Sequence, residues 1–209
     1  IGVEVVDLKV EPTAEALKQA IRGANEDETV SGIIVQLPLM NSEITEEVLS
    51  EIAPEKDVDG LSGQRNFDSA TATAINWLLT GYNIDLKQKK IAIVGRGRLV
   101  GRPLVSMWTN SGLSVEVFHR GSDFSKLRDY DVIVTATGAP DLITDEMIRS
   151  GAVIVDAGTA SEGGKLVGDI SDEIRERTDI SAITPKIGGV GPLTVGVLFE
   201  NVLMAAERA

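Results

Sequence analysis

Short apolar runs alternate with amphipathic segments over the middle of the chain, between residues 91 and 156. The runs are rich in β-branched residues and bounded by turn residues, the pattern of buried strands; they lie at 91–94, 114–119, 131–135 and 152–156. Helical spacing marks the segments between them, at 101–111, 123–128 and 144–149. Strands that alternate with helices form a parallel sheet, so we expect an α/β lobe built on a doubly wound, Rossmann-like sheet.

The N-terminal part of the chain shows a shorter version of the same alternation. Two strands and two helices are expected there, in the order 1–10, 13–25, 30–37 and 42–52. A further helical pattern covers 70–79, and a last helix is expected at 194–208, after a glycine-rich turn at 188–191. We place a boundary along the helix at 70–79, so that residues 1–79 form a smaller α/β lobe and residues 80–192 the dinucleotide lobe.

A glycine-rich turn follows the strand at 91–94 directly. Gly95, Gly97 and Gly101 occupy the turn and the start of the next helix, with the spacing G-x-G-x-x-x-G. A side chain on Gly95 or Gly97 would keep a pyrophosphate away from the N–H groups at the helix N-terminus, where the positive end of the helix dipole lies. The spacing is one residue longer than the common dinucleotide fingerprint, so a purely structural turn remains an alternative.

Charge favours a phosphate-bearing ligand at this turn. The chain carries a net charge of −12, and an acidic protein repels nucleic acid and anionic membranes, so we expect neither as a partner. Between Lys87 and Arg128, however, nine basic residues face only two acids. A basic island around a glycine turn indicates a local anionic ligand, although a solvated basic surface would also explain it, and Lys87 to Lys90 belong to such a surface.

The second strand specifies the cofactor. Where an NAD-binding unit usually presents an acid to the ribose 2′-hydroxyl, this chain has Arg120. Arginine suits a 2′-phosphate, and Arg96 in the glycine turn can approach the same group. We therefore predict NADP rather than NAD. His119, the only histidine, is interpreted as a packed or capping residue.

The amino-acid composition argues against several other classes of protein. The chain has no cysteine and one histidine, which rules out disulfides and cysteine-ligated zinc and leaves little for a transition-metal site, so no metal is expected. No apolar run approaches the roughly 20 residues of a membrane span, and no signal peptide is visible. A reducing cytoplasm is the expected compartment. Two more loops at strand ends are expected to line the cofactor site, with candidate residues Thr137, Gly138, Gly158 and Thr159.

Four segments, taken together, resemble the methylenetetrahydrofolate dehydrogenase/cyclohydrolase family. They are Val35-Gln36-Leu37-Pro38, Pro54 to Gly60 (PEKDVDG), Gly95-Arg96-Gly97 with Val100-Gly101-Arg102-Pro103, and Gly188 to Thr194 (GGVGPLT), with Lys165 to Asp169 (KLVGD) in the right place between the last two. The resemblance implies a folate-binding lobe and a dinucleotide lobe around a cleft, with the C-terminal helix, residues 193–209, returning to the first lobe.

The resemblance also implies the activity and the site. Such an enzyme oxidises 5,10-methylenetetrahydrofolate with NADP and hydrolyses the methenyl product to 10-formyltetrahydrofolate. Asp59 would accept hydrogen bonds from the pterin, and Gln36 would lie beside the one-carbon bridge; read alone, they would be a turn carboxylate and a capping amide. The substrate wall would comprise Gly189, Val190, Gly191 and Pro192, and the cofactor contacts would include Arg96, Val100, Gly101, Arg120 and Thr159. A homodimer is expected.

The chain also departs from the family pattern. The family's catalytic lysine lies in a Tyr-x-x-x-Lys helix upstream of the position of Ile1, so we expect an N-terminal segment before it, and in these 209 residues alone we expect the dehydrogenase step to exceed hydrolysis. Ser69 to Ala72 stand where the family has Pro-Cys-Thr-Pro. Two alternatives stay open: a catalytically silent folate or nucleotide binder, and another NADP-linked reductase that shares only the cofactor lobe.

Overall fold

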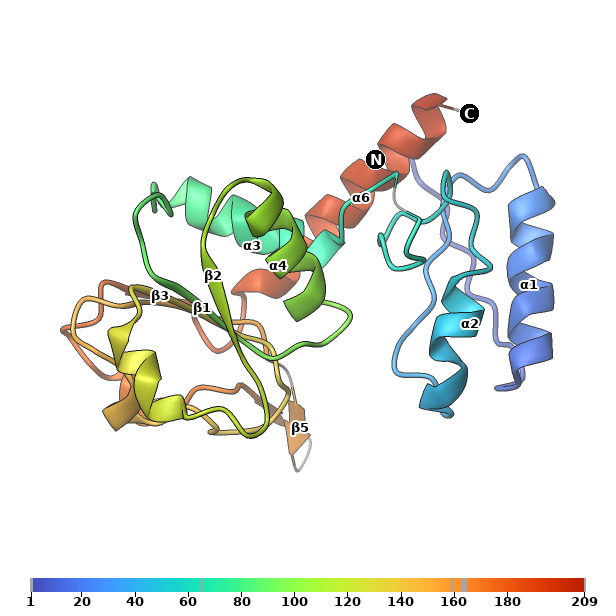
Figure 1. The fold of residues 1–209 in the computed structure, drawn as a ribbon. Helices are drawn as coiled ribbons and strands as arrows, with labels where there is room; N and C mark the ends of the chain where they lie inside the picture. The colour runs from blue at the N-terminus through green and yellow to red at the C-terminus, as the bar shows by residue number, and fades with distance from the viewer. Residues whose placement is uncertain (1, 65, 159, 163–164, 209) are drawn as a thin grey trace. The chain divides into compact units, whose positions relative to one another are not determined.

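The computed structural model describes residues 2–64, 66–158, 160–162 and 165–208. They form two compact units (Figure 1). The first comprises residues up to Phe67 together with those from Phe199 onward, and the second comprises Asp68–Leu198.

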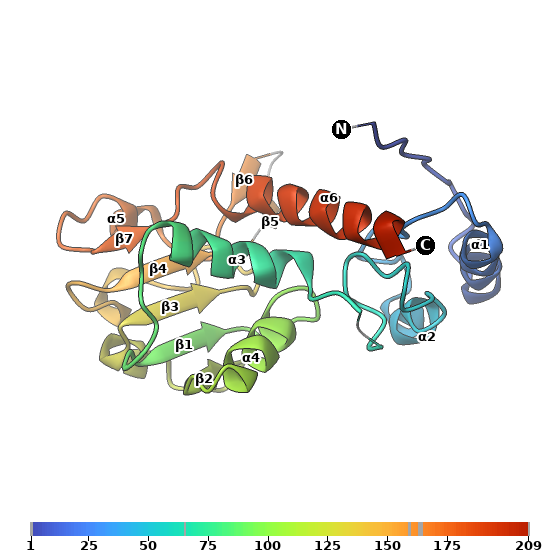
Figure 2. The ribbon, with the colours of Figure 1, turned by 90° about the horizontal axis from the view of Figure 1, so that it is seen from above.

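The second unit is built on a five-stranded parallel sheet with the order β2-β1-β3-β4-β7 (Figure 2). Its strands are β1 (Ile91–Val94), β2 (Val115–Phe118), β3 (Val132–Thr135), β4 (Val153–Asp156) and β7 (Ala182–Ile183). In register, Ile91 lies opposite both Val115 and Val132. The four strands expected from the apolar runs are therefore confirmed to within one residue at each end, and with them the doubly wound sheet.

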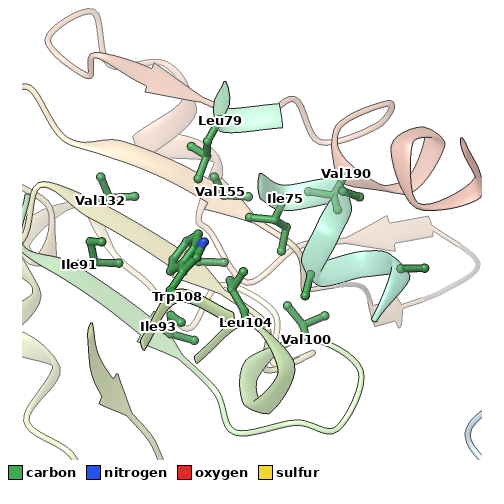
Figure 3. Packing of buried hydrophobic residues seen from close by; sticks show 14 of the residues in the cluster. Ile75, Leu79, Ile91, Ile93, Val100, Leu104, Trp108, Val132, Val155 and Val190 are labelled. Carbon is green, nitrogen blue, oxygen red and sulfur yellow. The ribbon is translucent and has the colours of Figure 1, made fainter. Parts of the chain in front are cut away.

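One face of this sheet is covered by α3 (Ala70–Gly81), α4 (Gly101–Asn110) and the first turns of α6 (Val190–Arg208). Figure 3 shows the packing: Ile91 and Ile93 point into a cluster that contains Ile75 and the indole of Trp108. Burial on both faces explains why β1 is continuously apolar and why β3 and β4 are apolar up to their last residue, whereas the edge strand β2 carries the exposed Glu116. Because α3 supplies four fully buried residues to this core, Ala70, Ala72, Ala74 and Ile75, it belongs to the second unit, and the expected boundary at residue 79 lies about twelve residues too late.

The other face of the sheet is covered by shorter elements. These are η2 (Phe124–Asp129), η3 (Asp145–Met147) and α5 (Asp172–Arg175). Leu127 of η2, Ile148 directly after η3 and Ile174 of α5 belong to a second cluster with Ala92 and Val94. The α-helices expected at 123–128 and 144–149 are thus 3₁₀ turns. A 3₁₀ turn needs fewer residues than a stable α-helix does, and here it suffices to bury one apolar residue of each segment. An antiparallel pair, β5 (Ala160–Glu162) and β6 (Lys165–Val167), precedes α5.

The first unit contains α1 (Ala14–Glu26), η1 (Ser42–Ile44) and α2 (Thr45–Leu49). The hydroxyl of Thr13 accepts a hydrogen bond from the N–H of Ala16 and caps α1 as expected. The strands expected at 1–10 and 30–37 are not formed among residues 2–64. A strand exists only through ladder hydrogen bonds to a neighbour. The N–H groups of Val30 and Ile33 donate instead to the carbonyls of Asp27 and Lys56, which lie in turns and loops.

Helix α6 contributes to both units: Val190 and Val197 are buried in the core of the second, and Asn201 and Ala205 in that of the first. It begins at Val190, four residues before the expected position. Within the described part of the chain it is the one helix long and apolar enough to cross a membrane by composition, with a mean hydropathy of 1.3 over 18 residues. Val190, Val197, Asn201 and Ala205 are the residues of this helix that pack into the protein core.

Candidate active site

The candidate cofactor site lies at the carboxyl edge of the five-stranded sheet, where β1 and β3 adjoin. From β1 the chain crosses to β2 on one side and then returns to β3 on the other, so this is the point where the strand order reverses. Ligands of open α/β sheets bind outside the strand ends at such a point. The loops that follow β1 and β3 touch there, because a Cβ added to Gly95 would lie 2.5 Å from the carbonyl oxygen of Ala136.

Gly95 and Gly97 differ in whether the fold leaves room for a side chain. Gly95 has φ of +113° and has no room for a Cβ, so the fold itself demands glycine there. A Cβ on Gly97, by contrast, would meet its nearest described neighbour, the carbonyl oxygen of Ala136, only at 3.8 Å, an ordinary contact. Packing therefore does not require glycine at position 97. An exposed, open backbone at this position suits the close approach of a ligand.

The N-terminus of α4 faces the same turn and carries no side-chain cap. Its N-cap residue is Val100, whose side chain is buried and makes no capping hydrogen bond. The N–H of Arg102 donates to the carbonyl oxygen of Gly97 at 3.0 Å and Pro103 has no N–H, so it is chiefly the positive end of the dipole of this ten-residue helix that favours a phosphate here. Both predicted cofactor residues, Val100 and Gly101, are buried, so the side chain of Val100 is not accessible to a ligand.

The loops that follow neighbouring strands bring the other predicted cofactor residues to this edge. Arg120 follows β2, Arg96 follows β1, Thr137 and Gly138 follow β3, and Gly158 follows β4. Arg96, Arg120, Thr137 and Gly138 are exposed, whereas Gly158 is buried. Thr159 lies outside the described residues. His119 makes a hydrogen bond from Nδ1 to the carbonyl oxygen of Arg120, 3.0 Å away, which agrees with its interpretation as a local capping residue.

Three further side chains near this edge are not among the predicted site residues. Asp156 and Asp169 are buried carboxylates, and Arg175 forms an ion pair with Asp156. A strand-end aspartate looks like a cap in sequence, and the KLVGD segment shows only that a Gly-Asp pair follows a short apolar run. Burial of both acids next to one arginine is visible only in the structure.

In the first unit, the predicted folate residue Asp59 lies in a loop that another aspartate shapes. Asp57 is buried, and its carboxylate accepts hydrogen bonds from the N–H groups of Leu61 at 3.1 Å and Ser62 at 2.8 Å. Asp59 receives no hydrogen bond or ion pair from the part of the chain described by the structure. Burial, and then the nearby charge of Asp57, raise the pKa of Asp59 to about 6. A half-buried carboxylate with open acceptor capacity is a candidate ligand-binding group.

Gln36 lies at the end of the segment that pairs with this loop through Ile33 and Lys56. Its side-chain amide donates to the carbonyl of Leu37 at 2.9 Å, and the residue is exposed. It borders a groove of about 380 Å³ lined mainly by apolar side chains, among them Leu8, Ile33 and Met40. Gln36 is thus accessible, with its Oε1 available to a ligand.

The predicted substrate wall forms the start of α6. Gly189 precedes the helix, and Val190, Gly191 and Pro192 make its first turn. Gly191 and Pro192 are exposed, but the side chain of Val190 is buried in the cluster of Figure 3, so only its backbone is accessible.

Comparison with known proteins agrees with these features. The chain matches the family described as tetrahydrofolate dehydrogenase/cyclohydrolase, by its NAD(P)-binding domain over residues 69–209 and its catalytic domain over residues 1–59. A bifunctional protein FolD of Macrococcus caseolyticus is 40% identical over 98% of this chain and 76% of its own length.

Solved structures give the same result. The bifunctional FolD enzyme of Campylobacter jejuni superimposes with a TM-score of 0.86 at 36% identity, covering 94% of this chain and 74% of that one. The Trypanosoma brucei enzyme, solved with NADP cofactor and an inhibitor, gives 0.84 at 34% identity, covering 94% and 73%. The chain therefore belongs to the tetrahydrofolate dehydrogenase/cyclohydrolase family.

Proposed function

We propose that this chain oxidises 5,10-methylenetetrahydrofolate to 5,10-methenyltetrahydrofolate with NADP and hydrolyses that product to 10-formyltetrahydrofolate. The observation that carries the proposal is the open backbone at Gly97 before the uncapped N-terminus of α4, with Arg96 and Arg120 on adjacent loops. These residues fit a dinucleotide that bears a 2′-phosphate, because arginine offers that group paired N–H donors. NADP, when bound, supplies the acceptor for the hydride.

We assign folate binding to the first unit. The Asp59 carboxylate is ionised above about pH 6 and can accept two parallel hydrogen bonds from the amino group and ring N–H of a pterin. Gln36 would lie beside the one-carbon bridge and orient it. Gly189, Gly191, Pro192 and the backbone of Val190 would contribute a wall of the substrate site.

The two half-reactions place different demands on these residues. Hydride transfer from the methylene carbon is assisted by the adjacent nitrogen lone pair, so it requires alignment and exclusion of water. Hydrolysis of the methenyl carbon also requires proton transfers, which a positioned side chain accelerates by about 10²–10⁴-fold. Assays of the two steps in parallel would therefore show how far Gln36 and Asp59 suffice for each.

The test of the cofactor assignment is the reversal of a charge. Arg120→Asp should weaken NADP binding and leave NAD binding nearly unchanged, measured by titration of the purified protein with each nucleotide. Lys87→Asp is the matched control, because Lys87 belongs to the same basic island but precedes β1, on the opposite edge of the sheet. Equal affinities of the wild-type protein for NADP and NAD, or an unchanged ratio in Arg120→Asp, would contradict the assignment.

We further propose that the functional lobes follow the units of the fold and that the protein is a homodimer in a reducing cytoplasm. The support is family membership for the dimer and the cysteine-free composition for the compartment. Light scattering coupled to gel filtration would test the dimer, since a monomeric mass at micromolar concentration would exclude it.

A further inference from the structure

Two buried carboxylates link the loops that follow β3 and β4. Asp169 is fully buried, and the Asp156 side chain is 3% exposed. Isolated charges are costly to bury, so each must be compensated by hydrogen bonds or an opposite charge. The only cation paired with them among the described residues is Arg175, which donates through Nη2 to Asp156 and through Nη1 to the carbonyl of Thr184, at 2.6 Å.

Asp156 uses its carboxylate to fix the chain around Asp169. It accepts hydrogen bonds from the N–H of Gly158 at 3.1 Å and from the N–H of Asp169 itself at 3.2 Å. The hydroxyl of Thr135, at the end of β3, donates to it at 3.2 Å. The backbone of residue 169 is thereby tied to the ends of two neighbouring strands.

Asp169 in turn directs its carboxylate at the loop after β3. It accepts hydrogen bonds from the N–H of Thr137 at 2.7 Å and from the N–H of Ala139 at 3.1 Å. A Cβ on Gly158 would overlap this carboxylate, so the neighbouring loop also packs directly against it. With these two N–H groups turned inward, the exposed outer side of the turn presents Thr137 and Gly138, two of the proposed cofactor residues.

The arrangement is not explained by stability alone. Asp169 and Asp156 repel one another, and burial together with this repulsion outweighs the hydrogen bonds and raises the pKa of Asp169. The loop after β3 could be closed by neutral side chains without such a penalty. The buried carboxylate of Asp169 therefore indicates that the conformation it imposes on the turn after β3 serves a function.

We propose that Asp169 is a positioning residue that holds the Thr137-Gly138-Ala139 turn in the conformation that receives the cofactor. The inference rests on the proposed NADP-binding function. It predicts that neutralising Asp169 releases the turn and weakens nucleotide binding, without direct contact between the carboxylate and the ligand.

The experiment compares Asp169→Asn with the wild-type protein, and uses Asp145→Asn as a control because Asp145 is an exposed carboxylate of the same unit, paired with Arg177. Hydrogen exchange in the absence of nucleotide should become faster at the N–H groups of Thr137 and Ala139 and stay slow in β1 and β3. NADP affinity by calorimetry should fall about tenfold. The control should change neither quantity.

The outcomes separate the two claims. If the wild-type protein binds neither NADP nor NAD, the proposed function fails. If the wild-type protein binds NADP, and Asp169→Asn binds it equally well with unchanged hydrogen exchange at Thr137 and Ala139, the inference about Asp169 fails. If the Asp169→Asn variant does not fold, NAD affinity of the wild-type protein is measured as a function of pH instead. NAD is used because it has no 2′-phosphate whose own protonation would change over the pH range. As the pH falls and Asp169 takes up a proton beside Asp156 and Arg175, the protection factors of the two N–H groups, which correct exchange for its intrinsic pH dependence, should fall and affinity should decline. Constant protection factors and constant affinity across that range would overturn the proposal.

Discussion

The side-chain amide of Asn201 donates a hydrogen bond of 2.8 Å to the carbonyl oxygen of Val58, a residue 143 positions earlier in the chain. Both residues are buried. Val58 is the residue before Asp59, and it packs with Phe67, Val202 and Ala205. Together with the Asp57 carboxylate, which holds the other side of the loop, this bond fixes the backbone that carries the proposed folate ligand.

Replacing Asn201 by leucine should therefore destabilise the first unit. Leucine matches the shape but leaves the Val58 carbonyl buried without a donor, which typically costs about 1–3 kcal/mol. Urea denaturation should show this loss in the free energy of unfolding, and folate affinity should fall while NADP affinity is kept. Glu200→Gln, on the exposed neighbouring residue, is the control. A variant as stable as the wild type would show that water or another donor satisfies the carbonyl.

The raised pKa of Asp59 predicts opposite effects on stability and binding. Between its ordinary value of 3.8 and about 6, the folded protein binds more protons at this site than the unfolded chain does, so the free energy of unfolding falls as the pH rises through this window. Above pH 6 the full penalty of the buried charge is present. Asp59→Asn should remove it and raise stability at pH 7.5 by roughly 1–3 kcal/mol.

Folate affinity should move in the other direction, because the ionised carboxylate is the proposed acceptor. We expect wild-type affinity to decline as the pH falls from 7 to 5, and Asp59→Asn to bind weakly throughout. Glu55→Gln, on an exposed acid of the same loop, should follow the wild-type profile. A flat wild-type profile would show that Asp59 does not bind folate through its charge.

Lys56 is predicted to stabilise the C-terminus of α1. Its ammonium group donates to the carbonyl oxygens of Ala24, Asn25 and Asp27 at 2.9, 2.8 and 2.7 Å, and a cation at this end of a helix also interacts favourably with the helix dipole. Lys56→Met keeps the aliphatic stem and removes the charge, so the free energy of unfolding should fall by about 2 kcal/mol.

The matched control is Lys18→Met, which removes an ion pair between the same helix and Glu47 of α2. Glu47, its partner, is 55% exposed, and surface pairs of this kind contribute about 1 kcal/mol or less. Equal losses in the two variants, measured by urea denaturation, would argue against a special role for Lys56.

The elements predicted best from the sequence are those whose burial is complete. Ile91 to Val94 are buried on both faces, so they read as an apolar run in any context, and the glycine turn follows because Gly95 has no room for a side chain. The segment 30–37 has similar composition but no ladder partner in the described structure. A strand depends on its neighbour, which the pattern of one segment does not contain.

The candidate cofactor and folate sites show the same limit of prediction from single segments of the sequence. Arg96 and Arg120 were predicted because an arginine in the glycine turn or at a strand end carries a chemical meaning, and Asp59 was predicted only through the family resemblance of its segment. Asp169 was not, because its role depends on the N–H groups of Thr137 and Ala139, about 30 positions away. Long-range hydrogen bonds between buried groups leave no periodic signal in a sequence.

The last prediction separates the glycines of the turn by their causes. Gly95→Ala should destabilise the second unit by more than about 2 kcal/mol, because alanine disfavours φ of +113° and its Cβ would meet the Ala136 carbonyl oxygen. Gly97→Ala meets neither obstacle, so its free energy of unfolding should stay within about 0.5 kcal/mol of the wild type. Its NADP affinity should nevertheless fall about tenfold, because the added methyl group would occupy the open backbone that a pyrophosphate must approach.

Gly23→Ala is the control: Gly23 also has open space around it, but it lies within α1, so this change should raise stability by about 0.5–1 kcal/mol and leave NADP binding unaltered. Thermal or urea denaturation and nucleotide titration of the three variants give both quantities. If Gly97→Ala binds NADP as tightly as Gly23→Ala does, the pyrophosphate does not approach the chain at residue 97, and the cofactor site would have to be sought elsewhere along the sheet edge.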